Sequence, residues 1–341
     1  MKKYCSLMIA LVAALFMSCS NDEIKISKTV NFTVNPSTVA NKFAAGEIHA
    51  GDMESFNTDC KLFVELFVYD RQGNLVEKRS ENFSNYAVQM KTSMFLDQGE
   101  YTAVAITHVD DVVDNYNYWI IENEETLEGL RVVDGGYIGG ENKVLGVSTY
   151  EFTVSGSTED ININVEPAGS LLTVEYFNIK ALSSYDIVEY RLVGNKTMEY
   201  LEFDRSGYTN VVADNHNGSY DWIYDKLTLS YYESGSYTNI YSYEFTLPMT
   251  NVGLQFWAYD SSSTYVNLGG TTLETRAGNC YYAFLRLSSN VSNITTEFGQ
   301  YTTSRSAGNN ENRAMAKMAY RKGEKGSFLA GQTLRIKDML K

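Results

Sequence analysis

The pattern of apolar and polar positions predicts β-strands along almost the whole chain. The longest apolar run, residues 61–70, reads KLFVELFVYD and is nearly continuous, which predicts a strand buried on both faces. A turn is predicted at 71–74, where Gly73 can take positive φ, before the apolar pattern resumes at Leu75. Only 181–186 and 311–321 are expected to form helices, both short, because no long stretch shows an apolar stripe at the helical period.

Further strands follow at short intervals with turn residues between them, a spacing typical of β-sandwiches or barrels. They are predicted at 29–34, 101–106, 144–154, 161–165, 171–179, 187–193, 227–232, 240–247, 254–259 and 280–287. A composition with 3 Pro and 26 Tyr in 341 residues also favours strands. We therefore expect an all-β fold of antiparallel sandwiches.

The first residues depart from this pattern and indicate export. Lys2 and Lys3 precede an apolar run at 7–17, and Ser18 then precedes Cys19, which is the layout of a secretory signal. The run is shorter than the ~20 residues that a membrane-spanning helix needs. The segment FMSC at 16–19 looks like a lipobox, at which bacterial lipoproteins are cut and acylated on cysteine, although Phe16 stands where Leu is usual. An ordinary signal peptide with an incidental cysteine is the alternative.

A short signal after Cys19 also indicates export. The sequence SNDE at 20–23 resembles the surface-export signal of Bacteroidales-type lipoproteins.

The predicted domain boundary lies near the middle of the chain. Pro167 and Gly169 interrupt the chain between two strong strands, after which the strand pattern restarts. We therefore expect a signal peptide at 1–18, a linker at 19–29, one sandwich at 30–166, a second at 167–300 and a basic tail at 301–341.

Composition limits the partners. An apolar content of 44% is enough to bury a core, and a net charge of −14 would repel phosphate backbones, so we expect no nucleic-acid partner. Of the 4 cysteines, Cys5 leaves with the signal and Cys19 takes the lipid. Cys60 and Cys280 could form one long-range disulfide in an oxidising compartment, or both could be buried thiols. Both alternatives stay open.

Two segments resemble a known family. The sequence LFVELFVYDRQGNLV at 62–76, followed by LDQGEYTAVAITH at 96–108, resembles the first domain of the fimbrillin-type proteins of Bacteroidales, lipoproteins that form or anchor surface fimbriae. The resemblance covers about 19–180 and implies two transthyretin-like sandwiches. It also implies a mechanism: in polymerising subunits a protease removes the first strand, usually after a basic residue, and the open groove accepts a strand from the next subunit.

The expected first strand contains Val30, Phe32 and Val34 at alternating positions. Lys42 is the only Lys or Arg between Lys28 and Lys61, so the usual arginine cleavage site is absent or replaced by Lys42. This suits an anchor or accessory subunit that keeps its first strand. The alternative is that Lys42 is a solvated loop charge.

The basic tail is a second candidate for strand exchange. Leu334, Ile336 and Leu340 fit a strand period of two, and the same segment fits a helix about as well. A disordered or locally packed basic tail is the simpler alternative.

No catalytic site is expected. The three histidines, His49, His108 and His216, are far apart and form no metal-binding pair, and no Gly-x-Ser-x-Gly motif frames a nucleophile. We expect neither catalysis nor a cofactor nor a metal.

The alternative function uses exposed rings. Trp222, Tyr231, Tyr237 and Trp257 could stack on sugars, although alternating Tyr on strands more often builds sandwich faces. The sequence therefore predicts a lipoprotein of the outer-membrane surface or fimbrium that binds other fimbrial subunits, with glycan binding as the alternative.

Overall fold

The computed structural model describes residues 27–39, 60–113, 116–135, 144–156, 160–177, 187–193, 200–211, 222–228, 239–259, 265–287 and 294–300. These residues are almost entirely β-strands, with one helical turn at 37–39, which confirms the all-β prediction. The two expected helices, 181–186 and 311–321, lie outside the described residues. No helix in the described ranges is long and apolar enough to cross a membrane.

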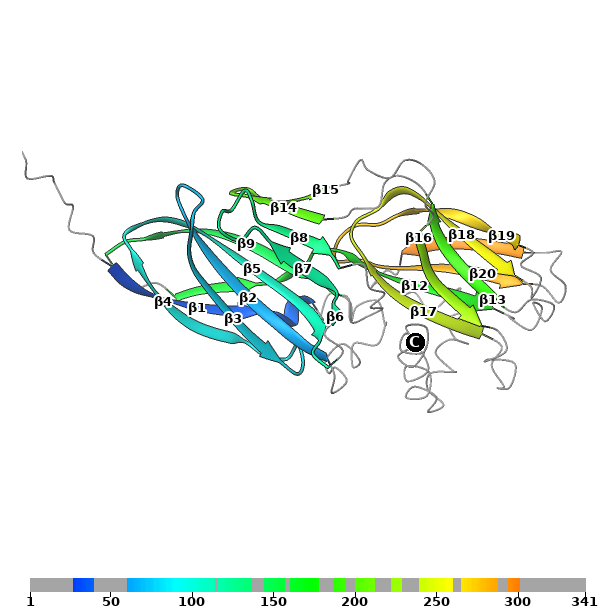
Figure 1. Ribbon diagram of the computed structural model, residues 1–341, viewed down its shortest axis with the longest axis horizontal. Helices are drawn as coiled ribbons and strands as arrows, with labels where there is room; N and C mark the ends of the chain where they lie inside the picture. Colours follow the sequence, from blue (N-terminus) through cyan, green and yellow to red (C-terminus); the bar gives the residue numbers. More distant parts are fainter. Residues whose placement is uncertain are drawn as a thin grey trace, which may run out of the picture.

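Two sheets face each other at the start of the described chain (Figure 1). The β1 sheet has the order β10-β1-β4, formed by β10 (Asp160–Asn164), β1 (Ser27–Asn35) and β4 (Met90–Asp97). The β5 sheet has the order β11-β9-β5-β2-β3, formed by β11 (Glu166–Pro167), β9 (Gly146–Val154), β5 (Gly99–Asp111), β2 (Cys60–Asp70) and β3 (Leu75–Phe83), with β6 (Tyr116–Asn117) paired to β5.

A third sheet lies against the β5 sheet. This β8 sheet has the order β15-β14-β8-β7, formed by β15 (Gly207–Val211), β14 (Tyr200–Asp204), β8 (Arg131–Asp134) and β7 (Trp119–Glu122). The β7–β8 connection lies over β2, because the Tyr69 hydroxyl donates to the Glu124 carbonyl at 3.0 Å. The central strands of the β5 sheet are therefore covered on both sides.

The remaining strands form two four-stranded sheets. The β12 sheet has the order β17-β12-β20-β21, formed by β17 (Asn239–Thr246), β12 (Ser170–Phe177), β20 (Cys280–Leu287) and β21 (Ile294–Gln300). The β18 sheet has the order β16-β13-β18-β19, formed by β16 (Trp222–Thr228), β13 (Ile187–Val193), β18 (Thr250–Tyr259) and β19 (Tyr265–Glu274).

The strand order repeats along the chain. β1 lies between an antiparallel neighbour, β4, and a parallel one, β10, and β12 lies in the same way between β17 and β20. The order β9-β5-β2-β3 likewise corresponds to β19-β18-β13-β16. Two domains of similar fold would produce this matching strand order. The division of the chain at 166/167 stays a prediction.

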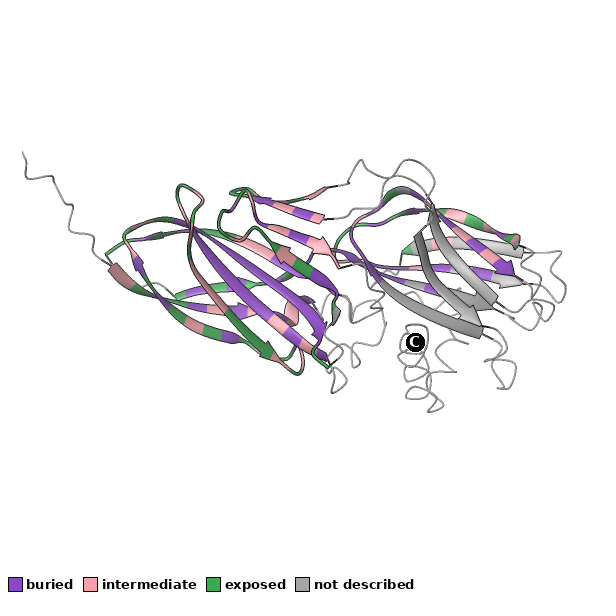
Figure 2. Ribbon diagram, viewed as in Figure 1, coloured by how far each residue is buried: buried purple, intermediate pink, exposed green. Residues whose placement is uncertain are grey.

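The predicted burial of β2 on both faces is confirmed, as Figure 2 shows for the strands at the centre of the β5 sheet. Leu62, Val64 and Leu66 are fully buried on one face, and Phe67 and Tyr69 on the other. The turn after β2 is also confirmed, with Gly73 at φ 83°. These buried strands form a common core with residues of the β12 sheet, Leu171 and Phe245 among them.

Candidate functional site

The candidate site is the place that β1 occupies, which we call the β1 slot. The sequence TVNFTV alternates apolar and polar side chains, so β1 can bury one face and solvate the other. β1 pairs antiparallel with β4 from Ser27↔Asp97 to Val34↔Met90, and parallel with β10 from Asn31↔Asp160 to Asn35↔Asn164. It therefore fills the centre of its sheet between two strands that lie far along the chain.

The inner side of the slot is apolar. Val30, Phe32 and Val34 are at most 2% exposed, so all three predicted side chains point into the core. The Phe32 ring meets the Phe152 ring edge-on, with centroids 5.6 Å apart, and Phe152 stacks on Tyr101 at 5.5 Å. The sequence predicts the alternation, but it could not predict this aromatic cluster, whose members come from β1, β9 and β5.

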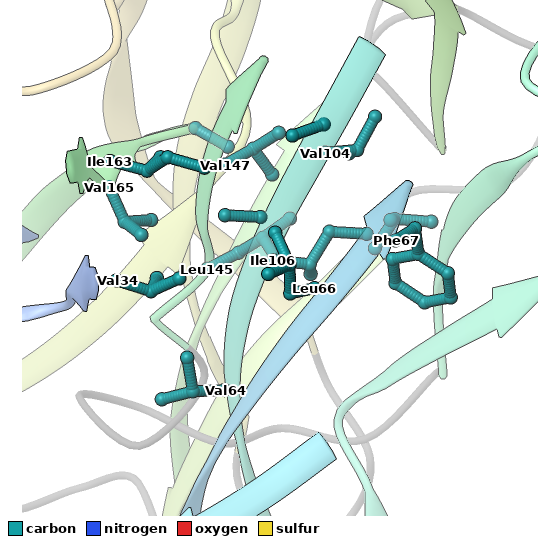
Figure 3. Packing of buried hydrophobic residues seen from close by; sticks show 14 of the residues in the cluster. Val34, Val64, Leu66, Phe67, Val104, Ile106, Leu145, Val147, Ile163 and Val165 are labelled. Atoms are coloured by element: carbon teal, nitrogen blue, oxygen red, sulfur yellow. The ribbon is translucent and has the colours of Figure 1, made fainter. Parts of the chain in front are cut away.

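Val34 fills the far end of the slot. Figure 3 shows it beside Leu145, with Ile163 and Val165 close by. Ile163 is the register partner of Val34 on β10, and the Val165 amide donates to the Asn35 carbonyl at 3.0 Å. The slot is therefore closed by backbone bonds as well as by side chains at this end.

The outer side of the slot is polar and hydrogen-bonded. The Ser93 hydroxyl donates to Asn31 Oδ1 at 2.7 Å, and Asn31 Nδ2 donates to Asp160 Oδ1 at 2.8 Å, so Asn31 joins all three strands. Asn35 Nδ2 donates to Asn164 Oδ1 at 3.0 Å. This ladder favours polar side chains at the outward positions of any strand that occupies the slot.

The segment after β1 is also packed. Val39 is fully buried and lies against Gly146, where an added Cβ would come within 2.6 Å of the Val39 side chain. A side chain at 146 would thus push Val39 away. Lys42, the predicted processing site, follows closely in sequence but lies outside the described residues.

A second polar cluster lies on the opposite face of the β5 sheet. His108 is 6% exposed and lies between two carboxylates, with Nδ1 3.2 Å from Asp110 Oδ2 and Nε2 3.8 Å from Glu65 Oε2. Its ring stacks on Phe63 with centroids 5.4 Å apart. Lys78 Nζ extends the cluster, 3.4 Å from Glu65 Oε1 and 2.7 Å from Glu124 Oε1.

Neighbouring charges shift the pKa values of His108 and Glu65 in this cluster. Burial alone would lower the pKa of His108, but contact with Asp110 and Glu65 raises that pKa to about 9. Burial alone would raise the pKa of Glu65, but contact with His108 and Lys78 holds it below its usual value. His108 and Glu65 therefore carry opposite charges at neutral pH.

Sequence reasoning missed this cluster. It treated each histidine as a surface or satisfied core residue, because Glu65 meets His108 only through the β2–β5 pairing. A signal was present: His108 and Asp110 alternate on a strand otherwise rich in apolar residues. Within the described ranges, no group of three or more His, Cys, Asp or Glu residues is placed to hold a metal ion.

The other predicted site residues are divided between described and undescribed segments. Cys60 begins β2 and Cys280 begins β20, both buried, and a disulfide between them stays a prediction. Trp257 lies on β18, with Nε1 donating to Gln255 Oε1 at 3.1 Å, and Trp222 begins β16. The residues outside the described ranges are Cys19, Lys42, His49, His216, Tyr231, Tyr237, Leu334, Ile336 and Leu340.

No family model matches the chain, and no curated protein matches it. Several solved structures are similar to the chain. A proposed polysaccharide-binding protein of Bacteroides thetaiotaomicron has 14% identity and a TM-score of 0.48, covering 80% of this chain and 98% of that one. A proposed adhesin of the same species has 11% identity and a TM-score of 0.47, covering 82% of this chain and 100% of that one.

The fimbrial anchor protein Mfa2 of Porphyromonas gingivalis has 13% identity and a TM-score of 0.44, covering 81% of this chain and 100% of that one. The solved structures similar to this chain thus include a proposed adhesin and a fimbrial anchor protein.

Proposed function

We propose that this protein is a cell-surface lipoprotein that serves as a fimbrial anchor or accessory subunit and works by β-strand complementation. The observation that carries the proposal is the placement of β1. It is hydrogen-bonded on both sides to strands distant in the chain, and it buries three apolar side chains in the core. An added strand in the same place would gain the same backbone bonds and the same pockets.

The repeated strand order shows why β1 suits this role better than its counterpart. β12 occupies the equivalent central position, but only 168 and 169 separate it from β11, which is paired in the β5 sheet. β1 is the first described strand, so replacing it interrupts no connection between the other described strands. Of the two central strands, β1 is the one that can be exchanged.

Burial sets the strength of such an exchange. Burying a Val or Phe side chain contributes roughly 1.5–3 kcal/mol. The three inward side chains of β1 therefore contribute on the order of 5 kcal/mol before the ladder bonds are counted. A strand held this firmly stays in place unless a matching strand replaces it, which fits an anchor or accessory subunit that keeps β1 in its resting state.

The first prediction concerns complexes with fimbrial subunits. Purified full-length protein mixed with purified subunits is expected to form complexes that survive SDS without heating, because a strand inserted between two others is bonded along both edges. Gel electrophoresis of heated and unheated samples measures this. Retardation in polysaccharide gels without such complexes would contradict the proposal and favour glycan binding.

Lys42→Gln separates the two ways of making these complexes. If a partner strand displaces an uncleaved β1 from the slot, Lys42→Gln is expected to form the same complexes as the wild type. If cleavage at Lys42 must first empty the slot, the variant forms no complexes. The protein would then be assigned as a polymerising subunit and not as an anchor.

The second prediction concerns the lipid. Cys19→Ala is expected to move the protein from the membrane fraction to the soluble fraction and to abolish fatty-acid labelling, because each buried CH₂ of an acyl chain contributes about 0.8 kcal/mol to membrane binding. Cys5→Ala, within the predicted signal, is the matched control and should leave both unchanged. A Cys19→Ala protein that stays on the membrane would remove the lipoprotein assignment.

A further inference from the structure

We propose that the β1 slot selects a strand with an aromatic residue at its centre, so that residues 301–341 of a second copy of this chain are not the strand that replaces β1. The inference rests on the proposed strand exchange and names the partner that the exchange would accept. It is built from the side chains of β4 beside the slot, from the ring contacts of Phe32 and from the sequence of the competing segment.

The β4 side chains beside the slot differ in size. On β4 the register partners of Val30 and Val34 are Met94 and Met90, two long and buried side chains. The register partner of Phe32 is Thr92, which is much shorter. Long neighbours thus accompany the valines and a short neighbour accompanies the ring, so the central pocket has room for a larger side chain than the pockets beside it.

The central pocket is also aromatic. Phe32 meets Phe152 edge-on, and Phe152 stacks on Tyr101, the arrangement that aromatic quadrupoles prefer. Tyr101 is fixed in turn, because its hydroxyl donates to the Asp97 carbonyl at 2.8 Å. A ring at the centre of the occupying strand therefore meets a preformed partner, whereas an aliphatic side chain leaves part of the Phe152 edge uncovered.

Residues 301–341 do not supply such a strand. Within them, no Phe or Tyr has a large apolar residue two positions away on both sides: Tyr320 is followed at that spacing by Lys322, and Phe328 is preceded by Gly326. If Leu334 and Ile336 enter the slot, the third pocket receives Gln332 or Asp338. Burying an unpaired carboxylate or amide is strongly unfavourable, so this segment is a poor occupant.

The accepted partner can be described by its chemistry. It is an extended segment of the pattern apolar-x-aromatic-x-apolar, with β-branched residues favoured at the ends because Val30 and Val34 fill those pockets. It runs antiparallel to β4 and parallel to β10. At the position of Asn31 it carries a polar residue that can bond Ser93 and Asp160.

The test uses full-length protein carrying Phe32→Asp, which weakens the hold of its own β1 on the slot. Three fluorescent peptides are titrated by anisotropy: the β1 sequence 27–35, the same peptide with Phe32→Ala, and the sequence 328–341. The β1 peptide is expected to bind on the order of 100-fold more tightly than its alanine version, as core Phe-to-Ala changes predict, and the 328–341 peptide is expected to show no binding.

The outcomes separate the two proposals. If the alanine peptide or the 328–341 peptide binds within about threefold of the β1 peptide, the aromatic selectivity is wrong and strand exchange stands. If the β1 peptide fails to bind a host whose circular dichroism shows an intact β fold, strand exchange through this slot is wrong.

A second measurement does not need the weakened host. In the otherwise unchanged full-length chain, Phe32→Tyr is expected to keep the urea midpoint near that of the wild type, whereas Phe32→Leu is expected to lower it. Thr33→Leu, on the partly exposed side of the same strand, is the matched control and should leave the midpoint unchanged. A Phe32→Leu midpoint equal to the wild type would overturn the aromatic preference even if the Phe32→Asp host does not fold.

Discussion

His108→Gln is expected to lower the free energy of unfolding by on the order of 3 kcal/mol at pH 6 and by much less at pH 9.5. The reason is the pair of carboxylates around the ring: Asp110 and Glu65 bind the charged form of His108 and raise its pKa from 6.5 to about 9. Glutamine occupies similar space without the charge, so it leaves Asp110 and Glu65 with less compensation in a buried site.

The direction of the pH dependence follows from the raised pKa. Because the folded pKa exceeds the unfolded one, the contribution of His108 is complete below about pH 6.5 and is lost as the pH rises to about 9. Urea unfolding of both proteins between pH 5.5 and 9.5 measures the gap. Wild type and variant should converge towards the alkaline end.

Arg71→Gln is the matched control for this series. Arg71 pairs with Glu100, but both side chains are more than half exposed, so solvent screens the pair and little change is expected at any pH. A gap between wild type and His108→Gln that stays constant from pH 5.5 to 9.5 would show that His108 contributes by packing on Phe63 and not by its charge.

Gly169→Ala is expected to destabilise the protein by about 3 kcal/mol or more. A Cβ at this position would lie 2.3 Å from the Thr246 carbonyl oxygen and 2.6 Å from the Phe245 ring. The carbonyl belongs to the backbone of β17 and the ring packs edge-on against Trp119, so neither can move aside without disturbing its own sheet. Thermal and urea unfolding of the variant measure the loss.

Gly156→Ala is the control for this substitution. No heavy atom lies within 4 Å of the added methyl group, so the change should leave stability within about 0.5 kcal/mol of the wild type. If both variants unfold alike, the close approach of Gly169, just before β12, to β17 is not a determinant of stability.

Local pattern was enough to predict about half of the strands. The apolar run of β2 and the alternation of β1 both appear where expected, because each depends only on which side chains face a core. β16 is the largest displacement: it was predicted at 227–232 and occupies Trp222–Thr228 within the described residues. β19 was missed because Gly269 and Gly270 interrupt its apolar pattern, and Gly269 takes a positive φ next to a bulge. The strands β4, β7, β8, β14, β15 and β21 were not predicted either.

The contacts of the site could not be predicted in the same way. Phe32 was recognised as an inward residue, but Phe152 and Tyr101 reach it from other strands, and nothing near Phe32 in the sequence indicates them. The same applies to His108, whose partner Glu65 depends on the register between β2 and β5. Sequence pattern predicts which face of a strand is buried, whereas side-chain partners depend on how the strands are paired.

The composition of the β8 sheet bears on how the protein can be divided for recombinant production. β8 precedes residue 166, but its neighbour β14 follows it, and Leu201 and Phe203 of β14 are buried. A fragment ending at 166 would expose the edge of β8 and remove the salt bridge of Arg131 with Glu202. Because bare edges promote aggregation, a soluble N-terminal fragment should carry the hairpin at 200–211, grafted through a linker if necessary.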